Sequence, residues 1–218
     1  MRIKNFSVCF ILAVIILSLT SCSEGKKNEI TKDTLIGEWY SDELHGSFVF
    51  KDDDMLYLKV DFTDMLYIDE NGSVELNSGN TDNAHYNYDG TLYSFSIGEG
   101  DEEIDMITME RKGEPSDSVY GKYTLVSGIF YDQLSAQYGD MKDRYGMIVS
   151  ENRLDAEIRM CGYETDGEII TFTGDGMEDI FGISDNTENT ARYRCIIEKD
   201  VMTLVAANGN LVFTKVTE

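Results

Sequence analysis

The groups that enzymes and metal sites most often use are scarce in this chain. Its 218 residues include only two histidines, His45 and His85, which lack the close His-x-His or His-Glu-x-x-His spacing of a zinc site. The serine motif of hydrolases, the phosphate-binding loop and the dinucleotide fingerprint are also missing. We therefore expect no catalytic residues, no cofactor and no metal, and we interpret both histidines as surface residues of a protein that is not an enzyme.

Positive charge is scarce too, with 18 Lys and Arg against 41 Asp and Glu and a formal net charge of −23. Because nucleic acid and anionic lipid headgroups both attract basic surfaces, this balance argues against nucleic acid as a partner and against a folded body pressed onto a membrane. Acidic stretches at residues 52–54, 69–72 and 175–179 invite a calcium interpretation, but none follows the EF-hand loop. We interpret them as turn-forming residues.

An apolar run occupies the N-terminus of the chain. It follows Arg2 and Lys4 and holds about a dozen residues, which suits a secretory signal and is shorter than the roughly 20 residues of a membrane span. The run ends in Leu-Thr-Ser-Cys at residues 19–22. This stretch resembles the lipobox of bacterial lipoproteins, in which the cysteine thiol receives a diacylglyceryl group before the signal is cleaved.

The resemblance implies that residues 1–21 are a signal peptide and that Cys22 is the lipid attachment site, bearing diacylglyceryl and palmitate chains. An ordinary signal peptide with an incidental cysteine is the alternative. Residues 22–33 then form the lipidated N-terminus and a polar tether, which reaches at most roughly 35 Å when extended. We expect an extracytoplasmic protein anchored to the cell membrane, or to the outer membrane if the host is Gram-negative.

Two cysteines, Cys161 and Cys195, remain after the N-terminal ones are assigned to the signal and to lipid. Strand alternation places Cys161 among outward polar residues and Cys195 on the inward side with Tyr193. Because side chains on opposite faces of a sheet point apart, a disulfide between them is not favoured.

Turn signals recur along the rest of the chain, as Asx-Gly pairs at residues 71–72, 89–90, 166–167 and 208–209. Such pairs suit the positive φ angles of tight hairpins, and the short segments between them alternate in polarity and are rich in aromatic and β-branched residues. This pattern predicts an all-β fold with antiparallel pairing. A helix is expected over residues 130–139, where Phe130, Leu134 and Tyr138 share one face.

The chain also repeats itself. Gly-Glu-Trp-Tyr at residues 37–40 recurs as Gly-Lys-Tyr-Thr at 121–124, and the segment 86–96 recurs at 163–173 with a shared Tyr, Asp-Gly turn and Phe. The only proline lies in residues 113–117, which we interpret as a linker. Two units follow, one over residues 34–112, with an added hairpin near residues 64–82, and one over residues 118–218.

These features resemble the small lipocalin-like β-barrel domains that occur, often in tandem, in bacterial surface lipoproteins. The resemblance implies two antiparallel β-barrels in tandem. The repeat and strand alternation place Trp39 and Phe95 inside the first unit and Tyr123 and Phe172 at matching places in the second. The fuller lipocalin opening, Gly-x-Trp with a supporting Arg, is only half met by residues 37–39. The family lends a fold but no specific activity.

Two functions remain open. One is a binding protein for a small apolar molecule or a surface glycan. The other is an interaction or structural module whose partner is another envelope protein. An unfilled apolar cavity of a few hundred Å³ would favour the first, whereas filled barrels with an exposed apolar patch would favour the second.

Overall fold

The computed structural model describes residues 29–63, 66–76, 83–139, 143–174, 190–206 and 209–217. This part of the chain is mostly β, with two α-helices, α1 (Lys32–Leu35) and α2 (Ile129–Tyr138), and a 3₁₀ turn at Gly100–Glu102. The predicted β-rich class with antiparallel pairing is confirmed. The predicted signal peptide, Cys22 and most of the tether lie outside the described residues, as do residues 175–179 and Asn208.

Thirteen of the strands in this part of the chain belong to one sheet, and two form a separate hairpin. The strands of the large sheet are β1 (Gly37–Ser41), β2 (Gly46–Phe50), β3 (Met55–Asp61), β6 (Ala84–Tyr88), β7 (Leu92–Ile97), β8 (Ile104–Arg111), β9 (Gly121–Ser127), β10 (Tyr145–Ser150), β11 (Arg153–Asp166), β12 (Ile169–Thr173), β13 (Thr190–Glu198), β14 (Val201–Ala206) and β15 (Gly209–Lys215). The hairpin consists of β4 (Leu66–Ile68) and β5 (Val74–Leu76), joined over the predicted Asn71-Gly72 turn.

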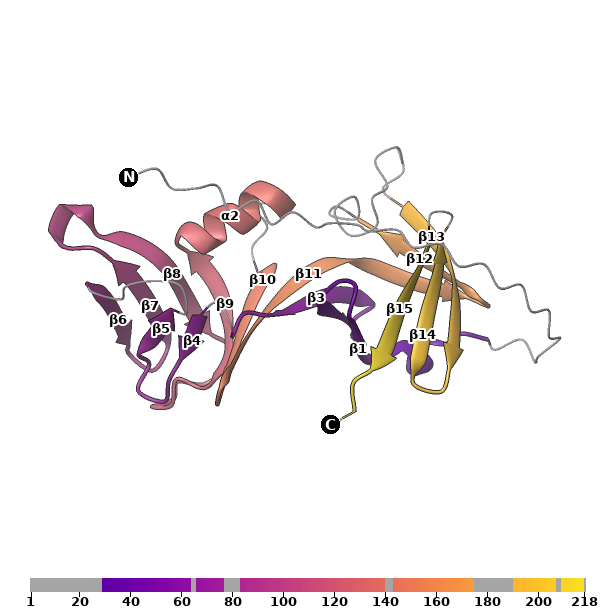
Figure 1. The fold of residues 1–218 in the computed structure, drawn as a ribbon, viewed down its shortest axis with the longest axis horizontal. Coiled ribbons are helices and arrows are strands. Elements are labelled where there is room, and N and C mark those ends of the chain that lie inside the picture. Colours follow the sequence, from indigo (N-terminus) through magenta and orange to yellow (C-terminus); the bar gives the residue numbers. More distant parts are fainter. Residues whose placement is uncertain are drawn as a thin grey trace.

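Eight strands close into a barrel, in the order β12-β13-β14-β15-β1-β2-β3-β11. The second half of β11 pairs back onto β12, where Tyr163 lies opposite Phe172, and this pairing completes the ring. The barrel lies at the right of Figure 1. A barrel of eight strands has an interior just wide enough for side chains to fill.

The remaining strands extend the sheet away from the barrel. From the first half of β11 the order continues through β10, β9, β8 and β7 to β6, and these strands curve into a second lobe at the left of Figure 1. Helix α2, predicted from its apolar spacing, lies over this lobe and ends at Gly139, which has φ 88°. The Tyr145 hydroxyl donates to the Leu134 and Gly139 carbonyls and so fixes the end of the helix to the sheet.

This strand order differs from the two barrels expected in tandem. The barrel combines β1–β3, from the first predicted unit, with β11–β15 from the second, while β9 and β10 join β6–β8. Residues 113–117 connect β8 to β9, and these two strands pair directly, with Glu110 opposite Thr124. The long strand β11 permits the mixed order because its first half pairs with β10 and its second half with β12.

The two halves of the sheet are nevertheless related by their registers. Strands β13-β14-β15-β1-β2-β3 correspond in order to β6-β7-β8-β9-β10-β11, with Trp39 opposite Lys215 in one half and Tyr123 opposite Arg111 in the other. The two halves meet where Lys59 lies opposite Glu157. Two pairs flank this position, Leu58 with Ile158 and Val60 with Ala156. The correspondence between the two halves superimposes each of these pairs on the other. The sheet therefore has an approximate two-fold axis through the pair formed by Lys59 and Glu157.

The four aromatic residues expected inside the fold, Trp39, Phe95, Tyr123 and Phe172, are all buried. Tyr123 occupies the place that corresponds to Trp39, as the repeat predicted. Phe95 has a different counterpart, because hairpin β6–β7 corresponds in register to β13–β14 and not to β11–β12. The matching position is Leu204, which is also buried.

The outward orientation predicted for Cys161 is wrong. Its side chain is buried, because the register of β11 against β3 shifts between Arg159 and Cys161, and such a bulge reverses the alternation of the residues that follow. Cys195 is buried as predicted, and both cysteines are free thiols. Burial raises the pKa of each thiol to about 12, so both are unreactive near neutral pH.

Candidate binding surfaces

The interior of the barrel is lined by aromatic side chains that contact one another. The ring centroids of Phe48 and Phe213 are 4.7 Å apart, and those of Phe50 and Tyr163 are 5.0 Å apart. Helix α1 lies beside Trp39, whose indole Nε1 donates to the Leu35 carbonyl at 2.7 Å. These side chains are buried against each other, so they form a packed core rather than the wall of a ligand cavity.

A cation lies over the aromatic residue of β1 and over the aromatic residue at the related position of β9. The Lys215 ammonium is 5.0 Å from the centre of the Trp39 ring, and the Arg111 guanidinium carbon is 5.7 Å from that of Tyr123. Arg111 also donates to the hydroxyls of Tyr88 and Tyr123 and to the carbonyls of Ser118 and Tyr120. Sequence analysis did not single out either cation. The signal was in the sequence, since each cation lies at the end of an alternating segment, but its aromatic partner belongs to a distant strand.

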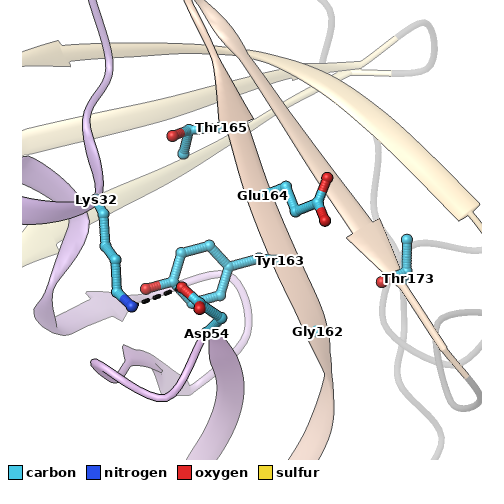
Figure 2. A pocket seen from close by; sticks show the side chains of 7 residues that line it. All are labelled: Lys32, Asp54, Gly162, Tyr163, Glu164, Thr165 and Thr173. Carbon is cyan, nitrogen blue, oxygen red and sulfur yellow. Dashed lines mark ion pairs between the residues drawn. The ribbon is translucent and has the colours of Figure 1, made fainter.

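An open pocket of about 460 Å³ lies beside the hairpin β11–β12, and Figure 2 shows its lining. Lys32 of α1 forms an ion pair with Asp54 at 2.6 Å and also donates to the Asp52 carbonyl. The Tyr163 hydroxyl donates to the Lys51 carbonyl at 2.8 Å. The residues that line the pocket are Lys32, Asp54, Gly162, Tyr163, Glu164, Thr165 and Thr173.

The chemistry of this pocket is polar. The carboxylate of Glu164 and the hydroxyls of Thr165 and Thr173 make no hydrogen bond with the described parts of the chain, so they can bind a ligand. Burial, together with the carboxylates of residues 52–54, raises the pKa of Tyr163 to about 12, which keeps its phenol protonated. A lining of hydroxyl, carboxylate and ammonium groups suits a hydroxylated ligand better than an apolar one.

The outer surface of the barrel carries exposed apolar side chains on three adjacent strands. Tyr40 on β1 and Val201 on β14 both lie opposite Thr214 of β15, and Val212 and Val216 flank Thr214 along its own strand segment. Each of the four is between 40% and 50% exposed. We call Tyr40, Val201, Val212 and Val216 the apolar strip.

Charged residues gather on the outer face of the strands near the two-fold axis. Lys59 lies 2.9 Å from Glu38 and 3.7 Å from Asp155, and Arg153 contacts both carboxylate oxygens of Asp155 at 2.9 Å. Asp155 is buried, and these two cations compensate its charge. Because each acid here has a basic partner, this network stabilises the sheet and is not a candidate site.

The other residues considered from the sequence lie apart from one another. His45 is exposed in the turn after β1, in the barrel, whereas His85 is exposed on β6, in the other lobe. Residues 52–54 form the turn between β2 and β3, and the Asp53 carboxylate accepts from the Met55 amide, as the turn interpretation predicted. In the described ranges, no three His, Cys, Asp or Glu side chains come together as metal ligands.

Neither helix in the described part of the chain is long and apolar enough to cross a membrane. Comparison of the whole chain with known proteins adds no relative: no family model, curated protein or solved structure matches it significantly.

Proposed function

We propose that this protein is a lipoprotein of the cell envelope, anchored through Cys22, whose folded part is a non-catalytic module that binds another envelope protein. Its location would be extracytoplasmic, on the cell membrane or on the outer membrane of a Gram-negative host. The observation that carries the proposal is the contrast between a barrel filled by its own aromatic side chains and an apolar strip exposed outside it.

The filled interior argues against transport of an apolar molecule within the barrel. Phe48, Phe50, Phe172 and Phe213 occupy the space that such a ligand would need. The apolar strip, by contrast, places four apolar side chains in water on neighbouring strands. These four side chains surround Thr214, and exposed apolar residues gathered in this way are typical of a protein interaction site.

Crosslinking in the native envelope tests the partner. A photoreactive amino acid at Val212, the most exposed residue of the apolar strip, should give one discrete adduct with an envelope protein when the full lipidated chain is expressed in its host. The same amino acid at Ile104, which is 48% exposed in the other lobe, is the matched control and should give none. Absence of an adduct at Val212, or the same adducts at both positions, would contradict the proposal.

The open polar pocket favours a second candidate, the binding of a surface glycan. Titration calorimetry of the mature chain with cell-wall or capsule oligosaccharides should then detect binding that Glu164→Gln and Thr165→Ala each weaken about tenfold. Asn87→Ala, an exposed change in the other lobe, is the control and should leave binding unchanged. Binding that is insensitive to both pocket variants would exclude this site.

The anchor has its own test. Stable attachment needs more than one acyl chain, since each buried CH₂ contributes about 0.8 kcal/mol and a single chain binds only reversibly. Cells fed a clickable fatty acid should label the wild-type protein and not the Cys22→Ala variant. Label that persists on that variant would place the lipid elsewhere.

A further inference from the structure

The chain enters the described structure at one end of the barrel. The Ile30 amide donates to the Gly167 carbonyl at 2.7 Å, in the turn between β11 and β12, and the Ile30 side chain is buried. Two residues later, Lys32 pairs with Asp54. The chain is therefore fixed to the barrel from residue 30, three residues earlier than the expected end of the tether.

Little chain separates this point from the anchor. Only residues 23–29 lie between Cys22 and Ile30. At 3.3–3.6 Å per residue, the distance from Cys22 to Ile30 is at most about 28 Å even when the segment is fully extended. The turn between β11 and β12 must stay within that distance of the bilayer surface, whereas β6–β8 lie at the opposite end of the molecule in Figure 1.

Charge favours the same arrangement. Residues 23–29 contain two Lys and two Glu, so the whole excess of acid lies in the body that follows. Anionic headgroups repel that body and have no net repulsion with the short segment next to the anchor. A folded part lying flat would bring its acidic side chains close to the membrane surface. Repulsion by the anionic headgroups therefore favours a molecule that stands on its barrel end.

We propose, on the basis of the Cys22 anchor proposed above, that the barrel end with the turn between β11 and β12 faces the bilayer and that the lobe of β6–β8 points away from it. The polar pocket then lies on the membrane side, because Lys32 and Thr165 belong to this end. The distal lobe, with its exposed Tyr86 and Ile104, is the part that extends farthest from the membrane.

Energy transfer to the bilayer measures this orientation. The lipidated full chain is reconstituted into phosphatidylcholine vesicles containing anionic phosphatidylglycerol and a headgroup acceptor dye. A donor is attached to Asp166→Cys, beside the turn, or to Asn87→Cys on β6, both at exposed positions. Cys161 and Cys195 are buried and do not compete for the label.

Transfer from position 166 should exceed transfer from position 87 at least twofold. Equal transfer, or stronger transfer from position 87, would overturn the orientation while leaving the anchor intact. Wild-type and Cys22→Ala proteins that associate with vesicles equally weakly would overturn the anchor itself. The same order of transfer in vesicles of phosphatidylcholine alone would assign the orientation to tether length, and its loss there would assign it to charge.

Discussion

Arg111, the last residue of β8, connects β6, β9 and the loop between β8 and β9 through hydrogen bonds. Its guanidinium donates to the hydroxyls of Tyr88 and Tyr123 and to two carbonyls in the connection between β8 and β9. Lys215, at the related position in the barrel, lies over Trp39. The same place in the repeat therefore has a hydrogen-bonding hub in one half and a cation over an indole ring in the other.

Replacing these two cations should have unequal effects. Arg111→Met leaves several partly buried acceptors without their donor, each at about 1–3 kcal/mol, so we expect a loss of at least 2 kcal/mol in the free energy of unfolding. Lys215→Met removes mainly the contact with the ring, worth about 0.5–1 kcal/mol at an exposed site. Urea unfolding of both variants measures the difference, and equal losses would contradict the role assigned to Arg111.

Phe95 and Ser94 test the two faces of β7. Phe95 is 1% exposed, and Phe95→Ala should lower the free energy of unfolding by about 3–5 kcal/mol. Ser94 is only partly buried and its hydroxyl makes no hydrogen bond with the described residues, so Ser94→Ala should change stability by about 0.5 kcal/mol or less. Similar losses in the two variants, measured by urea unfolding, would mean that the face assignment is wrong.

Hydrogen bonds to the Asp89 carboxylate make the stability of the turn between β6 and β7 depend on pH. Its carboxylate accepts from the amides of Leu92 and Thr91, and these hydrogen bonds lower its pKa below the ordinary value. Because the folded-state pKa is the lower one, the stabilisation is complete above the unfolded-state pKa and is lost as pH falls through the folded-state value. NMR titration should find Asp89 below the usual aspartate range, and Asp89→Asn should remove this part of the acid sensitivity.

The long strand β11 is the element that the sequence predicted least well. Alternation located strand character up to residue 161, but a bulge leaves no mark in composition, so the shift in parity after Arg159 could not be inferred. Turn signals, by contrast, are local. The hairpins at residues 71–72, 89–90 and 166–167 therefore formed where Asx-Gly pairs predicted them.

Thiol accessibility tests the bulge directly. With its side chain buried by the register shift, Cys161 should resist a maleimide reagent for hours at pH 7.5 in the folded protein, as should Cys195, and both should react within minutes in urea. The Thr173→Cys variant, at an exposed position of the neighbouring strand β12, is the positive control. Rapid reaction of Cys161 in the folded protein would instead mean that its side chain points outward, as strand alternation predicted.

At the scale of the whole molecule, the repeat was visible in the sequence but the pairing of its halves was not. The opening motif at residues 37–40 and 121–124 indicated two related units, and Trp39 and Tyr123 do occupy related places. The first strand of a unit can pair with the last strand of its own unit or with that of the other unit, and the outcome depends on residues far apart in the chain. Alternation along a strand carries no information about that choice. The barrel therefore contains strands from both units, and the strands on either side of residues 113–117 pair with each other.

Cleavage between β8 and β9 distinguishes the two arrangements. With a specific protease site in place of residues 113–117, the cut protein should remain one non-covalent complex in gel filtration, because β1–β3 are held in the barrel by β11 and β15. Uncut protein that carries the site is the control. Two independent barrels joined by a linker would instead separate into fragments of about half the mass.

The pairing of β1 with β15 also bears on when the protein can fold. Trp39 lies opposite Lys215, so one strand pairing of the barrel joins the beginning of the described chain to its end. Folds dominated by such contacts of high sequence separation fold slowly, because the chain entropy lost in closing the loop precedes the gain from packing. During synthesis β1 can pair with β2, but its other edge has no partner until β15 emerges. For a chain that is exported as we propose, this delay would keep it unfolded until the whole of it has crossed the membrane.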